Sequence, residues 1–121
     1  MSTVETTTFD LHDLREHVAA GDTAAFGAML ADDVEWTVID ERTRPAAPAV
    51  LRGRAAIVEM IRGAVERGIV THVTDGFVAG DRGALQLTCT YPTGGQVVEN
   101  ALVEIRDGRI ARWSGVQAWD E

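Results

Sequence analysis

The stretch NALVEIRDGRIARWSGVQAWDE, residues 100–121, decides the fold that we expect for this chain. Its Asp107-Gly108 pair is a typical two-residue β-hairpin turn, and apolar residues alternate along both arms. Residues that face each other across an antiparallel hairpin point to the same side of the sheet. Taking Arg106 and Arg109 as the last pair before the turn fixes the other pairs, which are Leu102 with Trp113, Asn100 with Gly115 and Val98 with Gln117.

The preceding hairpin extends this assignment to a third strand. A turn at residues 92–95 pairs Tyr91 with Gln96 and Cys89 with Val98. One face of the sheet is then mainly apolar, and we expect it to meet the helices. Its predicted members are Leu85, Leu87, Cys89, Tyr91, Val98, Asn100, Leu102, Trp113, Gly115, Gln117 and Trp119.

Three residues on this apolar face need an explanation. Asn100 and Gln117 carry amides, and an unpaired buried polar group costs on the order of 1 to 3 kcal/mol. They therefore indicate either a local hydrogen-bond network or a bound ligand. Gly115 lies in mid-strand, where glycine weakens a sheet unless something approaches the backbone closely. We interpret it as the floor of a pocket; the alternative is a bulge in a bent strand.

The first half of the chain predicts three helices and one strand, because apolar residues recur at helical spacing around helix caps. In order, these are a helix from Leu11 to Gly21, a short helix capped by Asp22, a strand up to Asp40, a loop at 41–52 and a helix from Arg54 to Gly68. Beyond them, the segments VAGDRGAL, TYPTGGQV and IRDGRI are turn signals between alternating stretches. They predict an antiparallel meander of four strands, and hence an α+β fold.

This order of elements resembles that of the SnoaL-like group in the nuclear transport factor 2-like superfamily. The likeness spans Leu11 to Asp120, and its clearest segments are AAGDTAAFGAMLADDVEW, LRGRAAIVEMI and the closing stretch quoted above. It implies three N-terminal helices packed in the concave face of a curved, mostly antiparallel sheet, with a mainly apolar pocket at the open end. The superfamily includes steroid isomerases, epoxide hydrolases, polyketide cyclases, dehydratases and members that only bind, so this fold does not choose a function.

The resemblance also allows the catalytic residues of two enzyme groups in the superfamily to be compared with this sequence. The general-base aspartate of the ketosteroid isomerases falls on Val38 and their oxyanion-hole tyrosine on Leu14, and neither residue suits that role. Their second oxyanion aspartate falls on Asn100, whose amide could still donate a hydrogen bond to a developing oxyanion. No arginine is predicted to face the pocket, which disfavours the epoxide hydrolase mechanism.

Two further residues are candidates for acid/base work. Asp40 shares a strand face with Trp36 and Val38, where the strand is expected to reach the pocket mouth, and a partly desolvated carboxyl has a raised pKa. The alternative is that Asp40 only starts the loop, as aspartate often does. His72 faces the pocket if the loop between the second and third strands has an even number of residues. A one-residue bulge would instead point Val73, Asp75 and Phe77 inward.

Composition sets the remaining limits. The chain has 121 residues and a net charge of −8, and all 11 basic residues are arginines, which suggests a bacterial coding bias. An acidic chain is a poor partner for nucleic acid, and no apolar run is long enough to cross a membrane. Arg42, Arg44, Arg52 and Arg54 form the one arginine cluster, which we interpret as a solvated loop and helix start.

Cys89 is the single cysteine, so no internal disulfide is expected, and the sequence predicts neither a metal site nor a cofactor. Residues 1–8 lack the basic and apolar segments of a secretory signal and are predicted to form a disordered leader. We therefore expect a single cytoplasmic domain at residues 9–121.

The sequence leaves two classes of function open. One is a cofactor-independent enzyme, an isomerase, cyclase or lyase, that moves a proton on a small apolar or aromatic carbonyl compound. Asp40 would then be the acid/base group and Asn100 would polarise the carbonyl. The other is a non-catalytic ligand-binding or dimerisation module. In both classes the predicted ligand contacts are Trp36, Val38, Tyr91, Trp113, Gly115, Gln117 and Trp119.

A homodimer is also expected, because the outer face of the sheet is too apolar for full solvation. Its predicted members are Val97, Ala101, Val103, Val116 and Ala118, mixed with threonine and glutamine.

Overall fold

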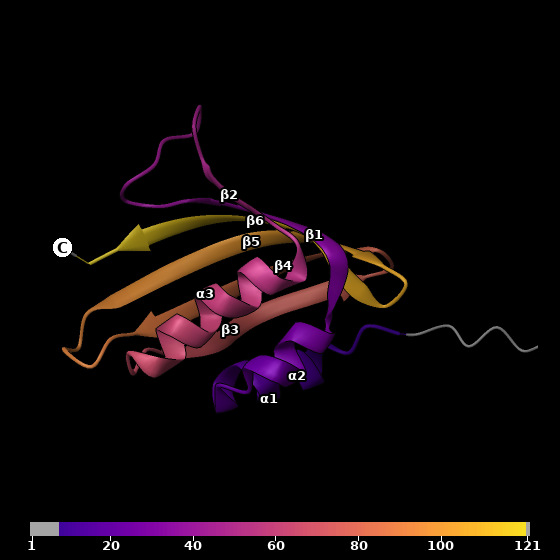
Figure 1. The fold of residues 1–121 in the computed structure, drawn as a ribbon, viewed down its shortest axis with the longest axis horizontal. Coiled ribbons are helices and arrows are strands. Elements are labelled where there is room, and N and C mark those ends of the chain that lie inside the picture. Colours follow the sequence, from indigo (N-terminus) through magenta and orange to yellow (C-terminus); the bar gives the residue numbers. More distant parts are fainter. Residues whose placement is uncertain (1–7, 121) are drawn as a thin grey trace, which may run out of the picture.

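The computed structural model describes residues 8–120, so the predicted leader lies, apart from Thr8, outside the described residues. Within residues 8–120, three helices and six strands follow one another (Figure 1). In order they are α1 (Leu11–Ala20), α2 (Thr23–Ala28), β1 (Leu30–Ile39), β2 (Ala49–Arg52), α3 (Arg54–Glu66), β3 (Val70–Ala79), β4 (Arg82–Thr90), β5 (Gln96–Arg106) and β6 (Arg109–Trp119). None of the helices in this part of the chain has the length and apolarity needed to cross a bilayer.

Local sequence signals set the helix ends. Asp10 caps α1 by accepting hydrogen bonds from the backbone N–H groups of the first turn, and Gly21 ends that helix in a left-handed conformation, with φ of 66°. Asp22 caps α2 through the backbone N–H of Ala25, at 3.0 Å. The predicted end of the first helix at Gly21 and the predicted cap of the second at Asp22 are therefore confirmed.

One six-stranded sheet contains all the strands, in the order β2-β1-β6-β5-β4-β3. The β1–β6 pair is parallel and the other pairs are antiparallel. The sheet is curved, and the three helices lie on one side of it (Figure 1). This is the predicted α+β architecture. The short strand β2 falls within the segment predicted as a loop, and it pairs with β1 at the edge of the sheet.

The core lies between the helices and the inner face of the sheet. Leu14 of α1, Phe26 of α2 and Ile57 of α3 are buried against residues of the central strands. At the centre, the indole rings of Trp36 on β1 and Trp113 on β6 stack with their centroids 4.1 Å apart and their planes within 3°. This stacking contact joins β1 to β6, which run parallel in the sheet.

The register of β5 differs from the prediction by one residue. Arg106 does pair with Arg109 across the Asp107-Gly108 turn, but a bulge after Ile110 shifts the pairing, so that Gly115 faces Ala101 rather than Asn100. The hairpin between β4 and β5 is shifted in the same way, because Cys89 pairs with Val97. A shift of one residue reverses every side chain of a strand. The predicted inward residues Val98, Asn100 and Leu102 therefore lie on the outer face, while Val97, Glu99, Ala101 and Val103 point inward and are buried.

Candidate active site

A cavity of about 630 Å³ lies between the helices and the inner face of the sheet. Leu14 and Val18 of α1, Phe26 of α2 and Ile61 of α3 form part of one wall. The sheet supplies the opposite wall, which includes the stacked pair Trp36 and Trp113. The lining is mainly apolar and encloses a volume suited to a small organic molecule.

Glu99 is the buried charged residue of this cavity. Its side chain comes from β5, lines the cavity and is only 8% exposed. The Trp113 indole N–H donates a hydrogen bond to Glu99 Oε2 at 2.6 Å, and the Gln117 amide donates to Glu99 Oε1 at 2.7 Å. Two donors thus hold the carboxyl group in one orientation, as a buried polar group requires.

Burial raises the pKa of the Glu99 carboxyl above its usual value, because leaving water disfavours the charged form. The hydrogen bonds from Gln117 and Trp113 favour the carboxylate and lower the pKa, but their effect is smaller than that of burial. A raised pKa makes a carboxylate a stronger base, which favours its use in proton transfer.

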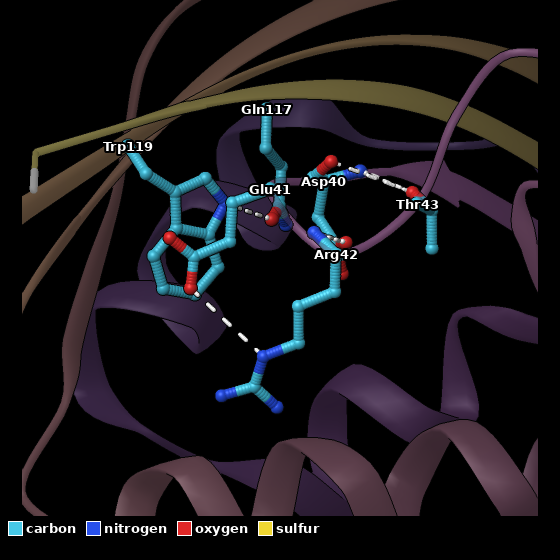
Figure 2. A network of polar contacts seen from close by, with 6 residues as sticks. All are labelled: Asp40, Glu41, Arg42, Thr43, Gln117 and Trp119. Carbon is cyan, nitrogen blue, oxygen red and sulfur yellow. Dashed lines mark hydrogen bonds and ion pairs between the residues drawn. The ribbon is translucent and has the colours of Figure 1, made fainter.

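A chain of hydrogen bonds leads from Glu99 to Trp119 at the end of β6. Gln117 Nε2 donates to Glu99, and Gln117 Oε1 accepts from the Trp119 indole N–H at 2.8 Å. Figure 2 shows the indole of Trp119 beside the Gln117 amide, with the loop after β1 across from them. Both residues line the cavity, as predicted from the sequence.

Gly115 has the close approach that its position suggested, but the group that approaches it is part of the protein. A β-carbon at residue 115 would lie 2.9 Å from the Glu99 carboxyl carbon and 3.0 Å from Trp113 Nε1. The glycine therefore makes room for the Glu99 carboxylate and its hydrogen bond from Trp113. The mid-strand glycine did signal a close approach. The predicted register was off by one residue, so the space was assigned to a ligand beside Asn100 instead of to Glu99.

Asn100 does not face the cavity, so the register predicted for it is wrong. It is exposed on the outer face of the sheet, where Gln86 Nε2 donates to Asn100 Oδ1 at 3.1 Å. Glu99, the preceding residue on the same strand, takes the inward position. The sheet therefore brings Glu99, Trp113 and Gln117 together and leaves Asn100 apart.

Asp40 lies immediately after β1 and lines the cavity, and its carboxylate also organises the next turn. Asp40 Oδ1 accepts a hydrogen bond from the backbone N–H of Arg42 at 2.8 Å. The backbone N–H of Asp40 donates to Thr43 Oγ1 at 2.7 Å (Figure 2). Asp40 thus combines the two interpretations of the sequence, a place at the cavity and the start of a loop.

The other predicted contacts are divided between the cavity and the surface. Trp36, Val38 and Tyr91 line the cavity. His72 does not, because it is exposed on β3 while its neighbour Val73 is buried. A bulge after Val73 then keeps Asp75 and Phe77 on the outer face as well.

Cys89 lines the cavity near Glu99 and receives a hydrogen bond from the Thr71 hydroxyl, with Oγ1 3.3 Å from Sγ. Burial raises the pKa of this thiol, which keeps it in the neutral, weakly nucleophilic form. Within residues 8–120, His, Cys, Asp and Glu side chains form no group of three that could hold a metal ion.

The arginine cluster predicted around residues 42–54 does not act as one unit. Arg54 NH2 lies 2.7 Å from Asp32 Oδ1 and also donates to the Leu30 carbonyl, which fixes the start of α3 against β1. Arg52 lies 3.7 Å from Glu35 on the outer side of the sheet. Arg42 alone of the four lines the cavity, at its mouth.

Comparison with known families matches residues 11–113 to the SnoaL-like domain. A comparison with curated protein sequences finds no match.

Solved structures with the same fold are numerous. A Kribbella flavida protein provisionally named a ketosteroid isomerase superimposes with a TM-score of 0.71 at 20% identity, over 91% of this chain and 74% of that one. An NTF2-like protein of unknown function from Mesorhizobium loti has a TM-score of 0.68 at 24% identity, over 92% and 98% of the two chains. A protein with a cystatin-like fold from Methylobium petroleophilum has a TM-score of 0.75 at 16% identity, over 92% and 74%. At these identities the similarity shows the fold alone.

Proposed function

The chain belongs to the SnoaL-like domain family, and on this basis we propose that it is a cofactor-independent enzyme that moves a proton on a small apolar or aromatic carbonyl compound. The observation that carries the proposal is Glu99, a buried carboxyl group that faces a mainly apolar cavity and is held by two hydrogen-bond donors. Glu99 takes the acid/base role that the sequence analysis gave to Asp40.

The proposed reaction balances without any co-reactant. The Glu99 carboxylate removes a proton from the carbon next to the substrate carbonyl, and the C–H electron pair moves into an enol or enolate. Protonated Glu99 then returns a proton to the same or to another carbon of the substrate. The raised pKa of Glu99 helps both steps, because it brings the pKa of the carboxyl group closer to that of the substrate C–H group.

The cavity supplies the remaining requirements. The stacked indoles of Trp36 and Trp113 offer a flat apolar wall to an aromatic or alicyclic ring. Asn100 lies outside the cavity, so a different donor must polarise the carbonyl. We assign the polarisation of the carbonyl to the hydroxyl of Tyr91, a residue that lines the cavity. The centroid of its ring lies 6.0 Å from that of the Trp119 ring.

Exchange of carbon-bound protons for deuterium tests this proposal directly. We expect the protein to accelerate exchange at the α-carbons of 2-tetralone in D₂O, followed by NMR. Replacing Glu99 with Gln should lower the rate at least 100-fold, the usual scale of a general base. Asp40→Asn keeps the oxygen that accepts a hydrogen bond from Arg42 and should retain most of the rate. Glu104→Gln, on β5 like Glu99, should retain it as well. Equal exchange in wild type and Glu99→Gln would contradict the proposal, and loss in Asp40→Asn alone would return the acid/base role to Asp40.

One observation favours a second candidate, a binding protein without chemistry. Both Glu99 oxygens already accept a hydrogen bond, an arrangement that also suits a fixed anchor for a ligand hydroxyl or amine. In that case the cavity should bind 2-naphthol with a Glu99-dependent affinity while wild type shows no exchange activity on any ketone tested.

We also propose that the protein is a homodimer formed through the outer face of the sheet. Phe77 is 64% exposed there, Leu102 62% and Val116 55%, and a shallow hollow of about 400 Å³ lies among them. Register pairing puts Phe77, Ala84 and Leu102 in one row across β3, β4 and β5. An apolar patch on a protein of this size is typical of an interface.

A further inference from the structure

Trp119 holds a special position in the hydrogen-bond chain because an indole N–H can only donate. Its partner Gln117 carries one accepting oxygen and one donating NH₂ group. With the indole N–H directed at Gln117 Oε1 at 2.8 Å, the NH₂ group is left to donate to Glu99, at 2.7 Å. Reversing the Gln117 amide would bring its NH₂ group against the indole N–H and its oxygen against the Glu99 carboxyl group.

The Trp119 ring is itself fixed at the end of β6. The next residue, Asp120, pairs with Gln96 through two hydrogen bonds, from Gln96 N–H to Asp120 Oδ2 at 2.8 Å and from Asp120 N–H to Gln96 O at 3.0 Å. Trp119 pairs with Val97 in the sheet, and its ring packs against Tyr91. The direction of the indole N–H is therefore set by backbone pairing and packing.

We propose that Trp119 is a positioning residue, which fixes the orientation of the Gln117 amide and thereby keeps Glu99 a hydrogen-bond acceptor that is ready to take a proton from the substrate. This proposal rests on the proposed function in assigning acid/base work to Glu99. The hydrogen-bond arrangement itself does not depend on any reaction, and can be measured without a substrate.

Without the indole donor, Gln117 is free to reverse and to present its oxygen to Glu99. The protonated carboxyl group would then gain an acceptor and the carboxylate would lose a donor, so the titration midpoint of Glu99 should rise. Further titratable and charged groups line the same cavity as Glu99. They are Cys89 on β4, Tyr91 after it, Asp40 and Arg42 after β1, His17 on α1, Asp22 before α2 and Arg67 after α3. Of these groups, only Tyr91 is altered in the variants compared below, where it serves as a control.

The test is an NMR titration of the Glu99 carboxyl carbon in protein labelled with ¹³C-glutamate, with the signal assigned from Glu99→Gln. Trp119→Phe should raise the midpoint by roughly one pH unit, the scale of one hydrogen bond to a charged group. Gln117→Leu, which removes the donor altogether, should shift it in the same direction. Tyr91→Phe removes a hydroxyl beside Trp119 and leaves the chain intact, so it should leave the Glu99 midpoint unchanged.

A double substitution separates positioning from a direct effect of the indole. If Trp119 acts through Gln117, Trp119→Phe should add little to Gln117→Leu, because the two effects are coupled. An unshifted midpoint in Trp119→Phe, or an equal shift in the presence and absence of Gln117, would overturn the proposal. Absence of exchange activity in wild type would instead contradict the proposed function, and the titration would still measure positioning.

Discussion

The carboxyl group of Glu99 lies over the backbone of Gly115, so closely that a β-carbon at residue 115 would be 2.9 Å from the Glu99 carboxyl carbon. The two residues come from neighbouring strands, and the space left by the absent side chain of one is filled by the acid of the other. The glycine is thus part of the site, although it offers no chemical group of its own.

Replacing Gly115 with Ala should displace this carboxyl group. Its backbone does not have the positive φ that excludes alanine, so the expected cost comes from crowding alone, about 1 to 3 kcal/mol in the free energy of unfolding. Urea denaturation measures this loss, with Ser114→Ala on the outer face as the matched control. A Gly115→Ala protein with wild-type stability and an unchanged Glu99 titration would contradict the arrangement.

The stability of the protein should depend on pH through Glu99. The pKa of Glu99 is raised above the ordinary 4.5 in the folded state. At a pH between these two pKa values, the folded protein still holds a proton that the unfolded chain has released. The contribution of Glu99 to the free energy of unfolding is therefore complete below pH 4.5 and is lost as the pH rises through the folded-state pKa. The wild-type free energy minus that of Glu99→Gln, from urea unfolding at a series of pH values, should fall as pH increases. A difference that grows with pH would reverse the sign and refute the assignment.

Asn100→Leu should leave the cavity unaffected. The side chain lies on the outer face, and its amide is bonded to Gln86 at the surface. We expect 2-naphthol to bind this variant with an affinity within about twofold of wild type, by quenching of tryptophan fluorescence. A tenfold loss of affinity, about 1.4 kcal/mol, would mean that Asn100 reaches the ligand after all.

Leu102→Asp should dissociate the proposed dimer, because it puts a charge into the exposed apolar row. Light scattering at micromolar concentration should give twice the 13.0 kDa chain mass for wild type and the monomer mass for the variant. Val50→Asp, at an exposed position on the far edge strand β2, should remain dimeric. A wild-type mass near 13.0 kDa would reject the dimer.

The sequence predicted the layers of this fold better than it predicted which residues face the site. Turn residues and helix caps identified every element except the edge strand β2, as Asp107-Gly108 and Gly21 illustrate. The register of β5 could not be read in the same way, since Val97, Ala101 and Val103 are no more apolar than Val98 and Leu102 on the opposite side. Hydrophobic pattern fixes register only where the two faces of a strand differ. The bulge after Ile110 has no glycine or proline to mark it, and this single residue decides between Asn100 and Glu99.

The parallel contact of β1 with β6 has a consequence for how the protein is made. Its stacked indoles, Trp36 and Trp113, lie far apart in the sequence, so the ribosome must synthesise β6 before they can meet. Pairing of such distant segments requires closing a long loop and tends to come late in folding. The cavity wall is therefore expected to be completed after the β3–β5 meander, and a nascent chain would carry an exposed Trp36 until its last strand emerges.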